Sequence, residues 1–178
     1  MSTPQQPKPA KLIIGMFMKD VQLFKTVIDE LCKQYGKIDI ISNWIDFDFT
    51  SYYQKEMDSP LKRRIVSFQK LIDQKYLPDI KIFTNSLEQK FARDNMRTVN
   101  IDPGYLLPER FVLATGKNFT HRIYLDKGIY ADLTLIFQKG SFQILPWTYP
   151  DYAHENIHIF LEKIRKNYLI ELKNLTNK

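Results

Sequence analysis

Five strand-like segments follow one another closely in the second half of the chain, and this series constrains the fold most. Each is rich in the apolar, β-branched and aromatic residues typical of strands; they are residues 98–102, 110–115, 122–125, 131–137 and 142–145. Asp126-Lys127-Gly128 and Lys139-Gly140 are turn signals between neighbouring segments. Because parallel neighbours need a crossover of about a dozen residues, connections this short predict an antiparallel meander.

The first half of the chain predicts a central strand followed by an amphipathic helix. Residues 11–18 are almost continuously apolar, which is typical of a strand that is buried on both faces. Asp20 can cap a helix, Val27 and Leu31 recur at helical spacing, and Gly36 supplies a stop signal. We therefore expect a helix that begins near Asp20 and ends at Gly36.

The next segment contains further strand candidates. Residues 38–53 are mostly strand-like, and Asp46 and Asp48 alternate there with two phenylalanines. This alternation predicts aspartates on one strand face and aromatic rings on the other. Residues 64–68 predict another strand, although residues 61–72 also fit a helix.

Two further helices are expected. Asn85 followed by Glu88 resembles a capping box and predicts a short helix that ends near Arg93. An apolar stripe at helical spacing predicts a long C-terminal helix that packs on the sheet. The members of this stripe are Ile157, Phe160, Leu161, Ile164, Tyr168, Leu172 and Leu175.

These elements predict a single α+β domain over residues 11–178, preceded by a flexible tail at residues 1–10. Its sheet is expected to be mostly antiparallel, either open or barrel-like. The N-terminal helix and the long C-terminal helix are its two main helices. A chain of 178 residues is long enough for one hydrophobic core and leaves little room for a second domain.

Composition excludes several classes of protein. Cys32 is the only cysteine, so neither an internal disulfide nor a thiolate-rich zinc site can form. No apolar run approaches the roughly 18 residues of a membrane helix, and the polar start does not resemble a signal peptide. We therefore expect a cytoplasmic protein with no membrane partner. The net charge of +6 suits an anionic ligand or RNA, or it only aids solubility.

Polar residues gather around Pro103-Gly104, a pair that we expect to turn the chain sharply. Asn100 and Asp102 project from the same strand face, and Tyr105 follows the turn. Such groups can hold a ribose hydroxyl, a base edge or a metal-bound water. The alternative is a common Asp-Pro-Gly turn in which the carboxylate bonds its own backbone. The sequence supports both interpretations equally.

A second polar group flanks the next connection between strands. Lys117, His121 and Arg122 can form a cradle for a phosphate or carboxylate, with arginine making bidentate contacts. His121 can also transfer protons near neutral pH. A solvated hairpin tip has the same composition, so this alternative stays open.

Three further groups are weaker candidates. The basic triplet Lys62-Arg63-Arg64 could meet phosphates, and the aromatic loop at residues 146–152 could stack on a ligand or plug the junction of sheet and helix. An acidic set could hold Mg²⁺ through oxygen ligands, or could line a solvated strand edge. Its members are Asp46, Asp48, Glu56 and Asp132.

Four strings occur together: Thr50-x-Tyr52-Tyr53-x-x-Glu56-Met57, Ile80-Lys81-x-x-Thr84-Asn85-x-x-Glu88, Arg97-x-x-Asn100-x-Asp102-Pro103-Gly104-Tyr105 and Trp147-Thr148-Tyr149-Pro150-Asp151-Tyr152. In these strings the chain resembles the prokaryotic domain-of-unknown-function 4416 family, from about residue 11 to 172. Some members of that family are described as GTP-binding, but the chain has no G-x-x-x-x-G-K-[ST] phosphate loop. The resemblance implies that one recurring set joins Asn100 and Asp102 with Thr84, Glu88, Arg97, Lys117, His121 and Arg122.

Three hypotheses for function follow. The first is a protein or enzyme that binds an anionic, phosphorylated or nucleotide-like small molecule, with or without Mg²⁺. Its catalytic candidates are His121, Asp102 and Glu56, and its ligand-binding candidates are Asn100, Tyr105, Lys117, Arg122, Arg97, Thr84 and Glu88. The second is a module that binds RNA or another protein without catalysis. The third is a structural or assembly role, in which the polar set is an internal hydrogen-bond network.

Overall fold

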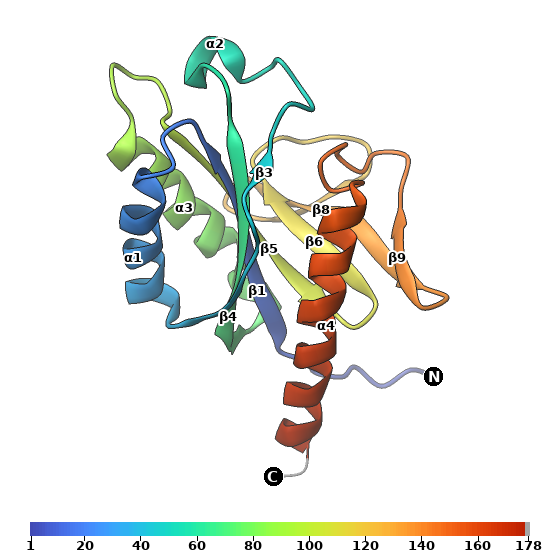
Figure 1. The fold of residues 1–178 in the computed structure, drawn as a ribbon. Helices are drawn as coiled ribbons and strands as arrows, with labels where there is room; N and C mark the ends of the chain where they lie inside the picture. Colours follow the sequence, from blue (N-terminus) through green and yellow to red (C-terminus); the bar gives the residue numbers. More distant parts are fainter. Residues whose placement is uncertain (177–178) are drawn as a thin grey trace.

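The computed structural model describes residues 1–176 and contains a nine-stranded sheet with helices on both faces (Figure 1). The strands are β1 (Ala10–Met18), β2 (Ile38–Ile41), β3 (Ile45–Asp46), β4 (Lys62–Ile72), β5 (Val99–Leu107), β6 (Arg110–Thr115), β7 (Arg122–Asp126), β8 (Ile129–Gln138) and β9 (Ser141–Ile144). The α-helices are α1 (Leu23–Tyr35), α2 (Gln54–Met57), α3 (Leu77–Phe91) and α4 (Glu155–Thr176), and a 3₁₀ turn, η1 (Gln74–Tyr76), precedes α3.

All strand pairings are antiparallel, and the strand order is β2-β4-β1-β5-β6-β8-β7. The short strands β3 and β9 pair with β4 and β8 beside this path. The prediction of an α+β fold with a mostly antiparallel sheet is confirmed. The barrel-like alternative is wrong, because no pairing joins the edge strands β2 and β7 within residues 1–176.

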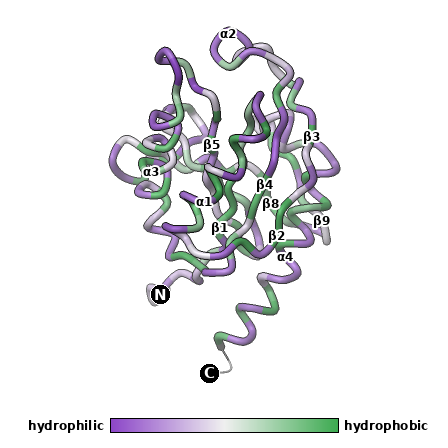
Figure 2. The backbone as a smooth tube through the Cα atoms, turned by 60° about the vertical axis from the view of Figure 1, so that its left-hand side comes forward, coloured by the Kyte–Doolittle hydropathy of each residue, from purple (hydrophilic) through white to green (hydrophobic). Residues whose placement is uncertain are grey.

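β1 lies in the middle of the sheet, and its two faces carry different cores. Leu12, Ile14, Met16 and Met18 point to the face that α1 and α3 cover, where α1 contributes its buried Leu31. We call this the α1/α3 face. Figure 2 shows hydrophobic residues along β1 and hydrophilic ones around α2.

The opposite face carries α4, and we call it the α4 face. Ile13 and Leu106 of the sheet pack there against Ile157, Leu161 and Ile164 of α4. These three side chains belong to the predicted apolar stripe, so the prediction of a long C-terminal helix packed on the sheet is confirmed. No helix within residues 1–176 has the length and apolar character needed to cross a bilayer.

Both predicted turns between strands are present. Lys127-Gly128 joins β7 to β8 and Lys139-Gly140 joins β8 to β9, and all four residues have a positive φ. Backbones of this kind suit tight antiparallel hairpins, because their twist matches that of the strands. Gly36 ends α1 at a φ of 88°, as its position predicted.

Three boundaries differ from the sequence predictions. Residues 62–72 form a strand, so the alternative of a helix over residues 61–72 is wrong. Residues 38–53 contain only β2 and β3, and the rest is loop and turn. α3 begins at Leu77 rather than at Asn85, because Asp73 caps the preceding turn and Pro78 is favourable in the first turn of a helix.

The Pro103-Gly104 pair does not turn the chain. β5 continues through it from Val99 to Leu107, with Pro103 opposite Ile14 of β1. The expectation of a turn at this position is therefore wrong.

Candidate functional site

β5 and β6 separate at one end of the sheet. They pair only from Gly104, which lies opposite Leu113, to Leu107, so the first residues of β5 have no partner in β6. Pro103 explains where the pairing stops, because a proline nitrogen has no hydrogen to donate. The main-chain nitrogen and carbonyl of successive residues in a strand point to alternate sides. Those of Ile101 and Pro103 therefore point to the same side of β5, away from β1. The sheet is therefore split beside Ile101.

Two charged side chains of α3 take the place of the missing strand. The amide of Ile101 donates to Glu88 Oε1 at 2.6 Å, and Lys81 Nζ donates to the carbonyl oxygen of Ile101 at 2.9 Å. Lys81 and Glu88 are each only 8% exposed. Thr84 lies between them on the helix, fully buried, and its hydroxyl donates to the carbonyl oxygen of Lys81. A helix normally turns apolar residues toward a sheet, so this polar stripe is unusual.

Side chains from α2, α3, β5 and the loop before β5 form one connected network, which we call the β5 cluster. Arg97 donates through Nε and Nη2 to both oxygens of Glu56 at 2.7 and 2.6 Å, and through Nη1 to Asn100 at 2.8 Å. Asn100 donates to Asp102 at 2.7 Å, and the other oxygen of Asp102 lies 3.6 Å from Lys81 Nζ. The members are Glu56, Lys81, Glu88, Arg97, Asn100 and Asp102.

The two glutamates of the β5 cluster differ in their electrostatic surroundings. The bidentate contact with Arg97 lowers the pKa of Glu56, and the pKa of Arg97 is raised in turn. Burial raises the pKa of Glu88 to about 7, and Asp102 adds to this, whereas Lys81, the amide of Ile101 and Arg97 oppose it. Glu88 can therefore gain or lose a proton near neutral pH, which is a property of general acids and bases.

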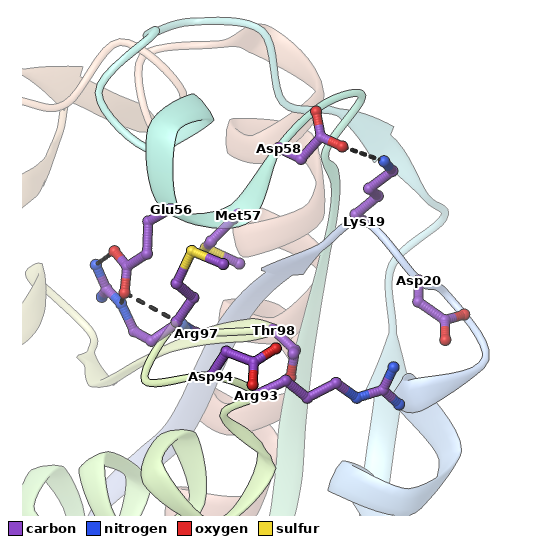
Figure 3. Close-up of a pocket in the computed structure, with 10 residues that line it drawn as sticks. Lys19, Asp20, Glu56, Met57, Asp58, Arg93, Asp94, Arg97 and Thr98 are labelled. Atoms are coloured by element: carbon purple, nitrogen blue, oxygen red, sulfur yellow. Dashed lines mark hydrogen bonds and ion pairs between the residues drawn. The ribbon is translucent and has the colours of Figure 1, made fainter.

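Two hollows border the β5 cluster and share Arg97. One of about 450 Å³ is lined by Glu88 and Arg97 together with other residues of α3 and the loop after it. The other, of about 420 Å³, is lined by Glu56, Arg93 and Arg97 among others. Figure 3 shows Glu56 of α2 and Arg97 facing each other here, with Lys19 and Asp58 paired nearby. The candidate acid Glu88 thus borders space that a small ligand could enter.

A second network lies on β7 and β8, and we call it the β8 cluster. Its members are His121, Arg122, Asp132, Trp147 and Tyr149. The carboxylate of Asp132 is 1% exposed and lies 2.9 Å from Arg122 Nε and 3.2 Å from His121 Nε2. Arg122 also donates to the carbonyl oxygen of Lys117 and to the Tyr149 hydroxyl, and the His121 ring stacks on Trp147. The guanidinium and the imidazole are therefore already engaged.

The strand carboxylates of the two clusters, Asp102 and Asp132, lie on the same face of the sheet. Asp102 and Gly104 share a face of β5, and Gly104 pairs with Leu113, which pairs with Asp132. Tyr149 is close to both: burial is the main cause that raises its pKa, Arg122 opposes this, and Asp132 and Asp102 both add to it. Asp102 and His121 make no direct contact, so the predicted groups share one face in two separate clusters.

Arg63, which the sequence offered only as part of a basic triplet, is buried on the same face. Arg63 and Tyr152 are each 2% exposed, and Arg63 Nη1 donates to Asp151. The guanidinium also lies 4.4 Å from the centre of the Tyr152 ring. Its Nε and Nη2, and the Tyr152 hydroxyl, make no hydrogen bond of acceptable geometry within the described chain. Each such group left alone costs about 1–3 kcal/mol.

The remaining predicted ligand residues lie in different surroundings. Tyr105 is 9% exposed and packs with Leu77 on the α1/α3 face, on the opposite side of the sheet from Asp102. β5 does not turn at Pro103-Gly104, so the alternation of side chains along the strand places Tyr105 on the face opposite Asp102. Lys117 is exposed, with Nζ 3.4 Å from the Tyr52 hydroxyl.

The weaker charged groups are separated from one another. Asp46 and Asp48 are exposed as their alternation predicted, and Asp46 pairs with Lys62. Arg63 is buried, and Arg64 lies over the rings of Phe24 and Trp44. The basic triplet at residues 62–64 therefore forms no continuous charged surface. No three His, Cys, Asp or Glu side chains within residues 1–176 are arranged to hold a metal ion.

Comparison with known proteins gives one match. No curated protein and no solved structure matches the chain. One family model, described as Domain of unknown function (DUF4416), matches residues 8–168. That match includes every residue of the β5 and β8 clusters, and the chain therefore belongs to this family.

Proposed function

We propose that the protein binds an anionic small molecule, phosphorylated or nucleotide-like, where β5 separates from β6. The observation that carries the proposal is the pair Lys81 and Glu88, whose buried charged groups stand in for a strand beside a hollow. A fold that needed only stability would fill this position with apolar residues or a paired strand, because buried charges stabilise little.

Two cations are available for the anionic part of such a ligand. Arg93 lines the smaller hollow and makes no ion pair with a described residue, and Lys117 has only a long contact to Tyr52. Arg122, which the sequence predicted together with Lys117 to hold the anion, has donors already directed at Asp132, Lys117 and Tyr149. The anion is therefore assigned to the smaller hollow, which Arg93 and Arg97 line, and Lys117 is a more distant cation.

Glu88 is the proton-transfer candidate in this proposal. It borders the hollow and its pKa of about 7 allows both protonation states, whereas His121 is stacked on Trp147 and directed at Asp132. An anion bound close to Glu88 favours its protonated form, so binding should take up a proton. Calorimetry in two buffers of different ionisation enthalpy measures this uptake.

The direct test is a thermal-shift and calorimetry screen with inorganic phosphate, nucleotides and sugar phosphates. The informative variant is Glu56→Ala with Arg97→Ala, because removing both partners leaves no unpaired charge from that bond. The matched control is Glu30→Ala with Lys90→Ala, an exposed ion pair between α1 and α3. A ligand that stabilises the wild type and the control but not the site variant supports the proposal.

Equal stabilisation of all three proteins would reject this location. Absence of any stabilising ligand in the screen would reject the class of ligand. Neither result affects the fold, which far-ultraviolet circular dichroism of each variant checks separately.

The β8 cluster favours a second, structural role within the same protein. Its buried carboxylate lies within bonding distance of one arginine and one histidine, and Arg122 ties residue 117 and Tyr149 to β8. A network that is satisfied in this way holds loops in place. We assign it to positioning the loops around the β5 cluster.

A further inference from the structure

We propose that Arg63 and Tyr152 together bind an oxyanion, either a carboxylate or a phosphoryl group. We start from three buried donors that make no hydrogen bond of acceptable geometry within the described chain: Arg63 Nε, Arg63 Nη2 and the Tyr152 hydroxyl, which lies beside the guanidinium. Because both residues are 2% exposed, bulk water does not satisfy these groups. A site that collects donors in this way calls for a bound acceptor.

The free atoms of Arg63 form the edge of a guanidinium that recognises oxyanions. Nε and Nη2 carry parallel N–H bonds, which match the two oxygens of a carboxylate or phosphate. Arg97 uses this same edge for the carboxylate of Glu56, at 2.7 and 2.6 Å. In Arg63 the opposite nitrogen, Nη1, donates to Asp151, and this contact fixes the guanidinium while its side-on edge stays buried and without an acceptor.

The Tyr152 hydroxyl and Gly15 complete the arrangement. A Cβ at residue 15 would lie 2.7 Å from the Tyr152 hydroxyl and 2.8 Å from Arg63 Nη2, so only glycine lets both donors approach the sheet here. Phe47 and Tyr152 flank the guanidinium with their rings, at 5.6 and 4.4 Å from their centres. The donors are thus held in place before an anion arrives.

The Arg63 and Tyr152 subsite lies beside the β5 cluster, across the pairing of β1 with β5. Gly15 lies directly opposite Asp102 in the neighbouring strand, and the side chain of Asp102 is 30% exposed. Asn100 and Lys81 occupy the oxygens of Asp102, which limits its repulsion of an anion. The inference rests on the proposed function: it assigns a second anionic group, or the carboxylate end, of the same ligand to Arg63 and Tyr152.

The test uses Tyr152→Phe in the full chain, titrated with inorganic phosphate and separately with acetate at constant ionic strength. This substitution keeps the ring and removes only the unpartnered hydroxyl. We expect the affinity for whichever anion binds to fall about tenfold, because one hydrogen bond to a charged group is lost. Phosphate and acetate distinguish the two chemical sources. Arg63→Lys, which lacks the parallel donors, should reduce binding further.

Tyr168→Phe is the matched control, since the Tyr168 hydroxyl donates to the carbonyl oxygen of Pro9 away from this site. Wild-type binding in this control and weakened binding in Tyr152→Phe would support the proposal. Equal anion binding by Tyr152→Phe and the wild type would overturn it, as would a wild type that binds neither anion. If Tyr152→Phe binds normally while the Glu56 and Arg97 double variant does not, the proposed function stands and only this subsite fails.

Discussion

The β5 and β8 clusters each include a strand carboxylate on the α4 face of the sheet, yet they differ in how their charges are satisfied. In the β8 cluster, Asp132 is 1% exposed and both of its basic neighbours are within bonding distance. In the β5 cluster, Glu88 has a pKa of about 7 and borders a hollow. Asp132 has a paired neighbour on both sides, Leu113 in β6 and Arg122 in β7, whereas β5 has no β6 partner beside Glu88. The carboxylate between paired strands is thus held by two basic side chains, whereas the carboxylate beside the unpaired part of β5 borders a hollow.

The largest effect is expected from Asp132→Ala in the β8 cluster. The change leaves Arg122 and His121 without their shared carboxylate, so the free energy of unfolding should fall by about 3–5 kcal/mol. Urea denaturation measures it. Asp48→Ala, which removes an exposed carboxylate, is the control and should change stability by less than about 0.5 kcal/mol. A similar small loss for Asp132→Ala would show that this cluster is not structural.

Gly104→Ala tests the point where the paired and split regions meet. The new Cβ would lie 2.4 Å from the carbonyl oxygen of Val112, so the β5–β6 pairing must shift, at a cost of about 3 kcal/mol. Gly116→Ala is a matched control, because a Cβ there meets nothing within 4 Å. Thermal unfolding of both variants checks the expectation. Equal melting temperatures would mean that the close approach at Gly104 is not required.

Glu88→Gln should remove a pH dependence that belongs to the β5 cluster. Folding raises the pKa of Glu88 from 4.5 to about 7, so the folded chain holds an extra proton between these values. The resulting stability is fully present below pH 4.5 and is lost as the pH rises through about 7. The variant stays neutral at this position. Between low and neutral pH its free energy of unfolding should fall by up to about 3 kcal/mol less than that of the wild type. Urea midpoints between about pH 4 and pH 8 test this; parallel profiles of variant and wild type would contradict it.

Lys117→Ala should give the smallest effect. The side chain is exposed, and its Nζ lies 3.4 Å from the Tyr52 hydroxyl and 4.9 Å from the centre of that ring. Its loss should therefore change the free energy of unfolding by less than about 0.5 kcal/mol. Binding of phosphate should weaken about two- to threefold at low salt, and this difference should disappear at high salt. A large loss of affinity that persists at high salt would place Lys117 in direct contact with the ligand.

The helices and hairpins that local patterns specify were predicted well. α1 and α4 follow from apolar residues at helical spacing, and the turns at Lys127-Gly128 and Lys139-Gly140 follow from local turn chemistry. The start of α3 was missed, because Asn85 resembles a cap although it lies inside the helix. Local signals thus fixed the type of element more reliably than its first residue.

The candidate site was predicted only in part, because its contacts join segments that are far apart in the chain. Glu88 reaches Ile101 and Arg97 reaches Glu56 only once α3 and α2 pack beside β5. Nothing near Arg63 in the sequence indicates that it meets Asp151 across 88 positions. Tyr105 lies away from Asp102 because Pro103 ends the pairing of β5 with β6 and does not turn the chain, which the sequence did not indicate.

Pro103 has a consequence for how the protein can change shape. Side chains and loops rearrange, but no rearrangement gives a proline nitrogen a hydrogen. Pro103 therefore cannot donate the next hydrogen bond of the β5–β6 ladder in any state of the folded chain. The missing donor is a covalent property of Pro103, so it persists whether or not a ligand is bound.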